Sequence, residues 1–188
     1  MISVKIGIFG GCFNPPHLMH KNIPIYLIEM GYIDKVIYVP TESSYNKKGL
    51  IPFKDRYNML NLMIDNIPNL EVSDIADKGY QYTYQVLDYF NNEDNDIYFI
   101  CGSDNLKEFK TWKNSDYILT NYKLLVIKRN SDDIDLILEE YNLYLNNIII
   151  ANIDEYNISS TIIRNDIDNN NKYIDHKVYQ YIKQKKIY

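Results

Sequence analysis

The sequence predicts an α/β protein: a doubly wound, Rossmann-like parallel sheet in a single domain over residues 1–188, with helices at the C-terminal end. Three observations predict it. Short apolar runs alternate with segments of helical spacing along the chain. Residues 97–101 are almost wholly apolar, which is typical of strands covered on both faces of a parallel sheet. The first apolar run ends in a glycine pair and is followed by a helical pattern.

The first elements follow from local signals. Residues 4–9 form an apolar run that ends at the glycine pair, which predicts a strand. Residues 17–30 follow two prolines, show helical spacing and end before a glycine, which predicts a helix. Residues 35–39 read as a second strand closed by a proline. The polar loop at residues 41–49 has little periodicity, and we expect it to be mobile.

The middle of the chain continues the alternation. A proline at residue 52 suits a first helical turn, and apolar residues from 57 to 67 recur at helical spacing, so we predict a second helix there. A short strand follows at residues 70–72. Another helical pattern covers residues 82–90 and leads into the apolar strand at residues 97–101.

The last third of the chain adds two strands and three helices. Residues 123–127 and 147–151 are apolar and predict strands. Residues 132–144 lie between them and predict a helix. Two further helices are expected near Ser160 and Lys177.

Composition and charge exclude several classes of protein. A net charge of -5 argues against nucleic-acid binding, which normally uses a basic face. No apolar run approaches the roughly 20 residues of a membrane span. The N-terminus does not resemble a signal peptide, so we expect a cytoplasmic protein with no membrane partner. Two cysteines, Cys12 and Cys101, are too few for a disulfide framework and lack the spacing of a metal site.

The segment GGCFNPPHLMH, at residues 10–20, carries the first candidate site. Ligands of open parallel sheets bind where the strands end, and a helix start at that place offers N–H groups to an anion. His17 and His20 lie three residues apart, on one face of the first helical turn. Both imidazoles can therefore reach one small volume, which suits a phosphate group. The alternative is that one histidine caps or packs the helix and the other faces solvent.

The same segment resembles the signature GGxFDPPHxGH of the nicotinate mononucleotide adenylyltransferases, which belong to the H-x-G-H nucleotidylyltransferase superfamily. The resemblance implies that His17 and His20 bind the phosphates of ATP and stabilise the transition state. It also implies ATP contacts from the preceding turn, at Gly10, Gly11, Cys12 and Phe13. The match departs at Asn14, usually Asp, and at Met19, where the signature has Gly. The Met19 side chain either points into the core or crowds ATP.

A second segment, ISSTIIR at residues 158–164, matches the superfamily pattern I-S-S-T-x-I-R. Hydroxyl and N–H groups at a helix start receive anions, and an arginine presents paired donors to phosphate oxygens. The resemblance gives Arg164 a catalytic role and implies ATP contacts at Ile158, Ser159, Ser160 and Thr161. The alternative is an ordinary helix cap with a solvent-facing arginine. Lys47, with Lys48 as the alternative, resembles the family's mobile lysine that closes on the phosphates.

The segment GYQYTYQVLDYF, at residues 79–90, resembles the family's S-Y-T-x-x-T-L segment. In the family this helix start receives the carboxylate of the nicotinate ring, in agreement with the preference of helix N-termini for anions. The resemblance therefore implies mononucleotide contacts at Tyr82 and Thr83. Asn14 belongs to the same implied site.

The segment CGSDNLKEFKTW, at residues 101–112, resembles the family's G-A-D segment followed by a tryptophan. The resemblance implies ATP contacts at Gly102 and Asp104, and the Asp104 carboxylate suits ribose hydroxyls. Trp112 suits an electron-poor pyridinium ring through stacking and cation–π attraction. The alternative for Trp112 is a partly buried core aromatic.

The resemblance covers about residues 5–188 and implies adenylyl transfer from ATP to nicotinate mononucleotide, with nicotinamide mononucleotide as a further acceptor and pyrophosphate as the other product. Mg²⁺ is expected to arrive with ATP, because no Asp/Glu cluster in the sequence resembles a dedicated metal-binding site. Two alternatives stay open: a pantetheine-phosphate adenylyltransferase, and a non-catalytic nucleotide-binding protein of the same fold. The sequence also leaves open the oligomeric state, with a homodimer as one option.

Overall fold

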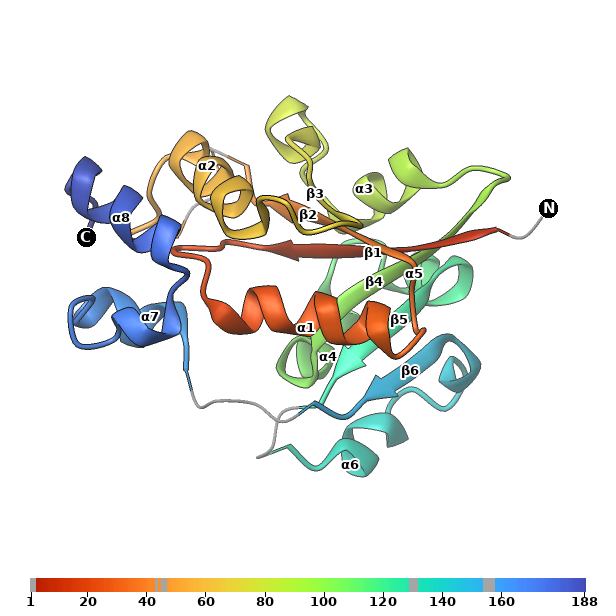
Figure 1. The fold of residues 1–188 in the computed structure, drawn as a ribbon. Helices are drawn as coiled ribbons and strands as arrows, with labels where there is room; N and C mark the ends of the chain where they lie inside the picture. Colours follow the sequence, from red (N-terminus) through yellow and green to blue (C-terminus); the bar gives the residue numbers. More distant parts are fainter. Residues whose placement is uncertain (1–2, 43, 45–46, 129–131, 154–157) are drawn as a thin grey trace.

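The computed structural model describes residues 3–42, 44, 47–128, 132–153 and 158–188, and in these residues six strands form one sheet (Figure 1). The strands are β1 (Val4–Gly11), β2 (Lys35–Pro40), β3 (Leu70–Val72), β4 (Asn95–Gly102), β5 (Lys123–Ile127) and β6 (Ile148–Ala151). Their order is β3-β2-β1-β4-β5-β6, and neighbouring strands pair in parallel. β2 and β3 therefore lie on one side of β1 and β4 to β6 on the other, and the predicted doubly wound α/β fold is confirmed.

Helices cover both faces of this sheet (Figure 1). They are α1 (Leu18–Glu29), α2 (Phe53–Ile64), α3 (Thr83–Phe90), α4 (Ser103–Glu108), α5 (Ser115–Asn121), α6 (Ile134–Glu139), α7 (Ser160–Asn165) and α8 (His176–Lys185). Short 3₁₀ turns lie at Ile75–Lys78, Phe109–Thr111, Leu145–Asn147 and Asn171–Tyr173. Buried side chains of α1, α2, α7 and α8 form one apolar layer, and those of α3 to α6 form the other. The strands contribute side chains to both layers, because successive side chains of a strand point to opposite faces of the sheet.

The helical predictions fail where a helix makes few apolar contacts. α4 and α5 were not predicted; each is short, and their apolar buried side chains are Leu106, Ile118 and Leu119. The helix predicted at residues 132–144 is wrong in length, because α6 ends at Glu139. Beyond that end Tyr141 is buried in the core, but Leu143 is 91% exposed, so the apolar side chains after α6 do not share one buried helical face.

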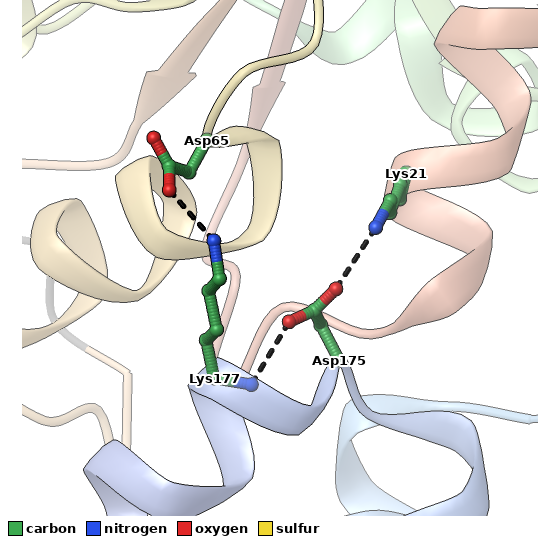
Figure 2. A network of polar contacts seen from close by, with 4 residues as sticks. All are labelled: Lys21, Asp65, Asp175 and Lys177. Carbon is green, nitrogen blue, oxygen red and sulfur yellow. Dashed lines mark hydrogen bonds and ion pairs between the residues drawn. The ribbon is translucent and has the colours of Figure 1, made fainter.

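α8 packs against α2 and is joined to α1 by an ion pair (Figure 2). Lys177, at its start, pairs with Asp65 at the end of α2, at 2.6 Å. Asp175, which caps α8, pairs with Lys21 of α1 at 2.9 Å. α8 thus connects the helices that follow β1 and β2.

The loop at residues 41–49 leaves the sheet beside the end of β1, where the Thr41 N–H donates to the Gly11 carbonyl at 2.9 Å. Residues 43, 45 and 46 of this loop, which the sequence predicts to be mobile, lie outside the described residues. Throughout the described ranges, no helix is both long enough and apolar enough to cross a membrane.

Candidate active site

A cavity of about 680 Å³ opens where β1 and β4 end. The chain leaves β1 toward α1 on one face of the sheet and leaves β4 toward α4 on the other, so a crevice forms between the two connections. The predicted site residues that line this cavity are Gly10, Gly11, Cys12, Phe13, Asn14, His17, His20, Lys47, Tyr82, Thr83, Gly102, Trp112, Ile158, Ser159, Ser160, Thr161 and Arg164. Asp104 is exposed and does not line it, whereas its neighbour Asn105 does. Residues from distant parts of the chain therefore meet in one place.

The two histidines lie at the start of α1. His17 is the residue before the helix and His20 is in its first turn, and their ring centroids are 3.8 Å apart. The backbone N–H of His17 donates to Nδ1 of His20 at 3.1 Å. Because Nδ1 accepts this bond, the neutral His20 ring carries its proton on Nε2. His20 therefore has one nitrogen fixed by the protein and a second that is a donor.

The turn before the histidines is shaped by an aromatic cluster. Phe13 is 2% exposed, adopts the left-handed backbone conformation (φ 47°) and places its ring 5.0 Å from the His20 ring. A Cβ at Gly11 would lie 3.2 Å from the Phe13 ring, which is a tight contact. Glycine at this position therefore leaves room for the ring. The hydroxyl of Tyr38 donates to the His20 carbonyl at 2.7 Å. Burial raises the pKa of Tyr38, which keeps this hydroxyl protonated.

Met19, which stands where the family signature has glycine, is 5% exposed and belongs to the apolar layer beneath α1. It also lines the cavity. Its side chain therefore packs in the core and turns part of its surface toward the site.

The start of α7 is fastened to the turn after β1. Ser160 Oγ donates to the carbonyl of Pro15 at 2.9 Å, and Ser159 Oγ caps the helix by accepting from Ile162 N–H at 3.3 Å. Arg164 donates from Nη1 to the carbonyl of Asn14 and from Nη2 to Thr161 Oγ1 at 3.0 Å. The hydroxyls of the ISSTIIR segment thus position α7 and the guanidinium of Arg164 at the edge of the cavity.

Lys47 reaches the cavity from the loop after β2. Its Nζ lies 3.7 Å from Sγ of Cys12. Lys48 does not line the cavity. The structure thus brings Lys47, and not the alternative, to the predicted phosphate site.

Arg56 of α2 belongs to the framework of the site, although no motif marks it. It is 0% exposed, and burial lowers the pKa of its guanidinium from the usual value. It donates five hydrogen bonds, to the carbonyls of Cys12 (3.1 Å), Thr41 (2.7 Å), Glu42 (3.4 Å) and Ile51 (3.0 Å) and to the Thr41 hydroxyl (3.1 Å). A signal existed in the sequence, because Arg56 shares one helical face with Met59, Leu60 and Met63. Arg56 ties both ends of the loop after β2 to the end of β1.

Aromatic and cationic groups gather around the start of α3. Nζ of Lys113 lies 4.2 Å from the ring centroid of Tyr82. Trp112 is half-buried, packs against Phe109 at a centroid distance of 4.8 Å and also lines the cavity. Its contact with a pyridinium ring stays a prediction. The Tyr82 N–H donates to Oε1 of Gln85 at 3.1 Å. The amide of Thr83 is the next donor at this helix start.

The charge of the cavity favours anions. Histidines aside, the charged side chains among its described lining residues are Lys47, Lys113 and Arg164, opposed by Glu42. No group of three or more His, Cys, Asp or Glu side chains suited to a metal ion occurs in the described parts of the chain. The site can therefore hold phosphates, and it presents little of its own to a bare cation.

The profile of the cytidylyltransferase-like family matches residues 8–166. A protein of Clostridium acetobutylicum, described as a probable nicotinate-nucleotide adenylyltransferase, is 36% identical over 198 residues, which cover 98% of each chain. A protein of Fusobacterium nucleatum with the same description is 37% identical over 172 residues, which cover 88% of this chain and 89% of that one. The chain belongs to the nicotinate-nucleotide adenylyltransferase family. The resemblance of its motifs to that family is thereby confirmed.

Solved structures of this family share its fold. The Plasmodium falciparum nicotinic acid mononucleotide adenylyltransferase complexed with NaAD has a TM-score of 0.81 at 23% identity and covers 96% of this chain and 95% of its own. The same enzyme complexed with APC has a TM-score of 0.81 at 22% identity, with 98% and 96% covered. These likenesses confirm the architecture of the sheet and its helices.

Proposed function

We propose that the chain transfers the adenylyl group of ATP to nicotinate mononucleotide, forming the dinucleotide and pyrophosphate. The observation that carries this proposal is the His17–His20 pair at the start of α1, in one cavity with Arg164, Lys47 and the aromatic residues near α3. Membership of an ATP-using adenylyltransferase family supports it.

The chemistry is an in-line displacement. A phosphate oxygen of the mononucleotide attacks the α-phosphorus of ATP, and the bond from that phosphorus to the bridging oxygen breaks, so pyrophosphate leaves with the electron pair. The attacking phosphate is already mostly dianionic near neutral pH, so no general base is required. The protein contributes position and charge stabilisation.

We assign the phosphate contacts to groups that the structure has already oriented. Nε2 of His20 is a donor because Nδ1 accepts from the His17 backbone. Lys47, Arg164 and His17 add donors around the negative charge that develops on the leaving pyrophosphate. The remaining ATP contacts are proposed for the backbone of the Gly10–Phe13 turn, Gly102 and the start of α7. Asn105, the neighbour of Asp104, lines the cavity, and the ribose contact of Asp104 stays a prediction.

Mg²⁺ fits this site as a companion of the triphosphate. Glu42 is the one carboxylate among the described lining residues, and the other charged side chains there are cations. Hard oxygen ligands for Mg²⁺ are therefore more plentiful on the nucleotide than on the protein. When bound, the ion neutralises phosphate charge, and the chain's own residues hold the nucleotide around it.

The pyridine ring is assigned to the part of the cavity formed by Tyr82, Thr83 and Trp112. A ring carboxylate would be received by the first amides of α3, with Lys113 nearby as a cation. A neutral amide would gain less from both features. We therefore infer a preference for the acid over the amide form of the mononucleotide.

The test compares two histidine variants in an assay of pyrophosphate release from ATP and nicotinate mononucleotide. His20→Ala removes an oriented donor, and loss of one such donor typically costs about 10²–10³ in turnover. His176→Ala is the control, because His176 lies exposed on α8 and contacts Gln180. The proposal expects the first variant to fold normally with turnover lowered at least a hundredfold and the second to match the parent. Near-normal turnover of His20→Ala would remove His20 from the mechanism.

A further inference from the structure

The chain after α8 turns back toward the active site. α8 itself is fixed by the ion pairs of Lys177 with Asp65 and of Asp175 with Lys21, and Lys177 N–H also donates to Asp175 at 3.0 Å (Figure 2). Lys186 then adopts the left-handed conformation (φ 54°), and the Ile187 N–H donates back to the Ile182 carbonyl at 3.1 Å. A rigid helix and a defined turn therefore determine where Tyr188 lies.

The hydroxyl of Tyr188 donates to Oδ1 of Asn14. The residue is 40% exposed overall, yet burial raises the pKa of its hydroxyl, against the opposing effects of Arg164 and Arg56. The hydroxyl end thus lies inside the protein near two site arginines, and it stays protonated as a donor.

Asn14 uses all its polar side-chain atoms within the protein. It is 3% exposed. Its Nδ2 donates to the Gly49 carbonyl at 2.8 Å, and Oδ1 accepts from the Ile51 N–H at 3.4 Å as well as from Tyr188. Its backbone carbonyl accepts from Arg164. Asn14 therefore connects Tyr188 to the segment at residues 47–51, which begins with Lys47, and to the guanidinium at the cavity.

We propose that Tyr188 is a positioning residue for adenylyl transfer: its hydroxyl fixes the side-chain amide of Asn14, which in turn holds residues 47–51 so that Lys47 faces the cavity. The amide is suited to this task because it offers an acceptor to Tyr188 and a donor to Gly49 at once. A carboxylate at this position would place an oxygen against the Gly49 carbonyl oxygen. The reaction itself rests on the proposed function, whereas the coupling between Tyr188 and residues 47–51 does not.

Tyr188→Phe removes one hydroxyl and keeps the ring. Tyr179→Phe is the matched control, because the Tyr179 hydroxyl donates to Asp168 at 2.7 Å on the exposed side of α8 and does not contact Asn14. We expect Tyr188→Phe to lower kcat about fivefold, in keeping with one lost hydrogen bond, and to leave the KM values within about twofold, because Lys47 acts on the transition state. Tyr179→Phe should leave both constants unchanged. Equal kcat values for the two variants would overturn the catalytic part of the proposal.

A second readout needs no substrate. Trypsin cleaves after lysine, so Lys48 offers a candidate site next to the Gly49 carbonyl that Asn14 holds, with Lys47 as a second one. Cleavage of a native protein follows the opening of the local segment. Tyr188→Phe should speed this cleavage about fivefold, whereas Tyr179→Phe should not. Faster cleavage in a protein without adenylyl transfer would leave the coupling in place and refute the proposed function. Unchanged cleavage would refute the coupling.

Asn14→Asp supplies an independent variant should Tyr188→Phe fail to fold. It keeps the acceptor for Tyr188 and loses the donor to Gly49, so it should also speed cleavage after Lys48. In an Asn14→Ala background, Tyr188→Phe should add nothing to the cleavage rate, because the proposed connection is already broken. Additive effects would show that Tyr188 acts by another route and would overturn the proposal.

Discussion

Replacement of the buried Arg56 should test how the loop after β2 is held at the active site. Arg56→Met keeps an unbranched apolar chain but removes the guanidinium and all five of its hydrogen bonds. The acceptors left behind belong to the end of β1 and to both ends of the loop. The substitution should therefore lower the free energy of unfolding and loosen the segment that begins with Lys47.

The size of the fall in the free energy of unfolding depends on the acceptors that lose the Arg56 guanidinium as their donor. A buried acceptor without a partner costs about 1–3 kcal/mol. Carbonyls at a cavity edge regain part of this from water, so the total is smaller than five such costs. A hydrogen bond from a charged donor is worth about 1.5–3 kcal/mol, so the loss of a few that water does not replace gives a total of roughly 3–5 kcal/mol. For a domain of this size that corresponds to a fall in Tm of roughly 10 °C.

The assay is urea unfolding followed by circular dichroism, with kcat and KM measured on the same preparations. Lys54→Met is the matched control, because Lys54 is exposed on the same helix. Arg56→Lys should be intermediate, since an ammonium retains the charge but cannot span the acceptors. Stability of Arg56→Met within about 1 kcal/mol of Lys54→Met would refute the conclusion that Arg56 holds the loop.

Three further predictions concern other parts of the site. Trp112→Ala should raise the KM for the mononucleotide about tenfold, from lost stacking, and leave that for ATP nearly unchanged; equal rises for both would contradict its assignment. Ser160→Ala should lower kcat several-fold by releasing α7 from the Pro15 carbonyl, and a parent-like kcat would show that this bond is unnecessary. Burial raises the pKa of Cys101 from 9.0 to about 12, so its contribution to stability is complete below pH 9 and is lost as pH rises from 9 to 12. Cys101→Ala should therefore show a shallower decline of the free energy of unfolding over that interval, and equal slopes would count against this explanation.

The sequence predicted the sheet well because its strands have strong local signals. The strand at residues 97–101 is almost wholly apolar, and the end of β1 and the following turn carry the glycines and histidines within eleven residues. ISSTIIR is likewise a contiguous segment. Their meeting at one end of the sheet follows from the parallel order of the strands, which the alternation of elements already implied.

The features that sequence reasoning missed depend on contacts between distant residues. The bond from Tyr188 to Asn14 and the five bonds of Arg56 join elements that no local pattern relates. The hydroxyls of Ser159 and Ser160 were expected to face phosphate, but in the structure they form hydrogen bonds with protein groups. The motif alone does not show which of these partners a hydroxyl takes. α4 and α5 were missed because short helices show too little periodicity. The homodimer and the roles of individual site residues stay predictions.

The most direct test of the account is pyrophosphate release by the purified protein with ATP and Mg²⁺, with nicotinate mononucleotide, nicotinamide mononucleotide and phosphopantetheine offered separately. The account predicts release with nicotinate mononucleotide, at a kcat/KM above that for the amide form, and none with phosphopantetheine. Release with phosphopantetheine alone, or no release from folded protein that binds ATP, would contradict it.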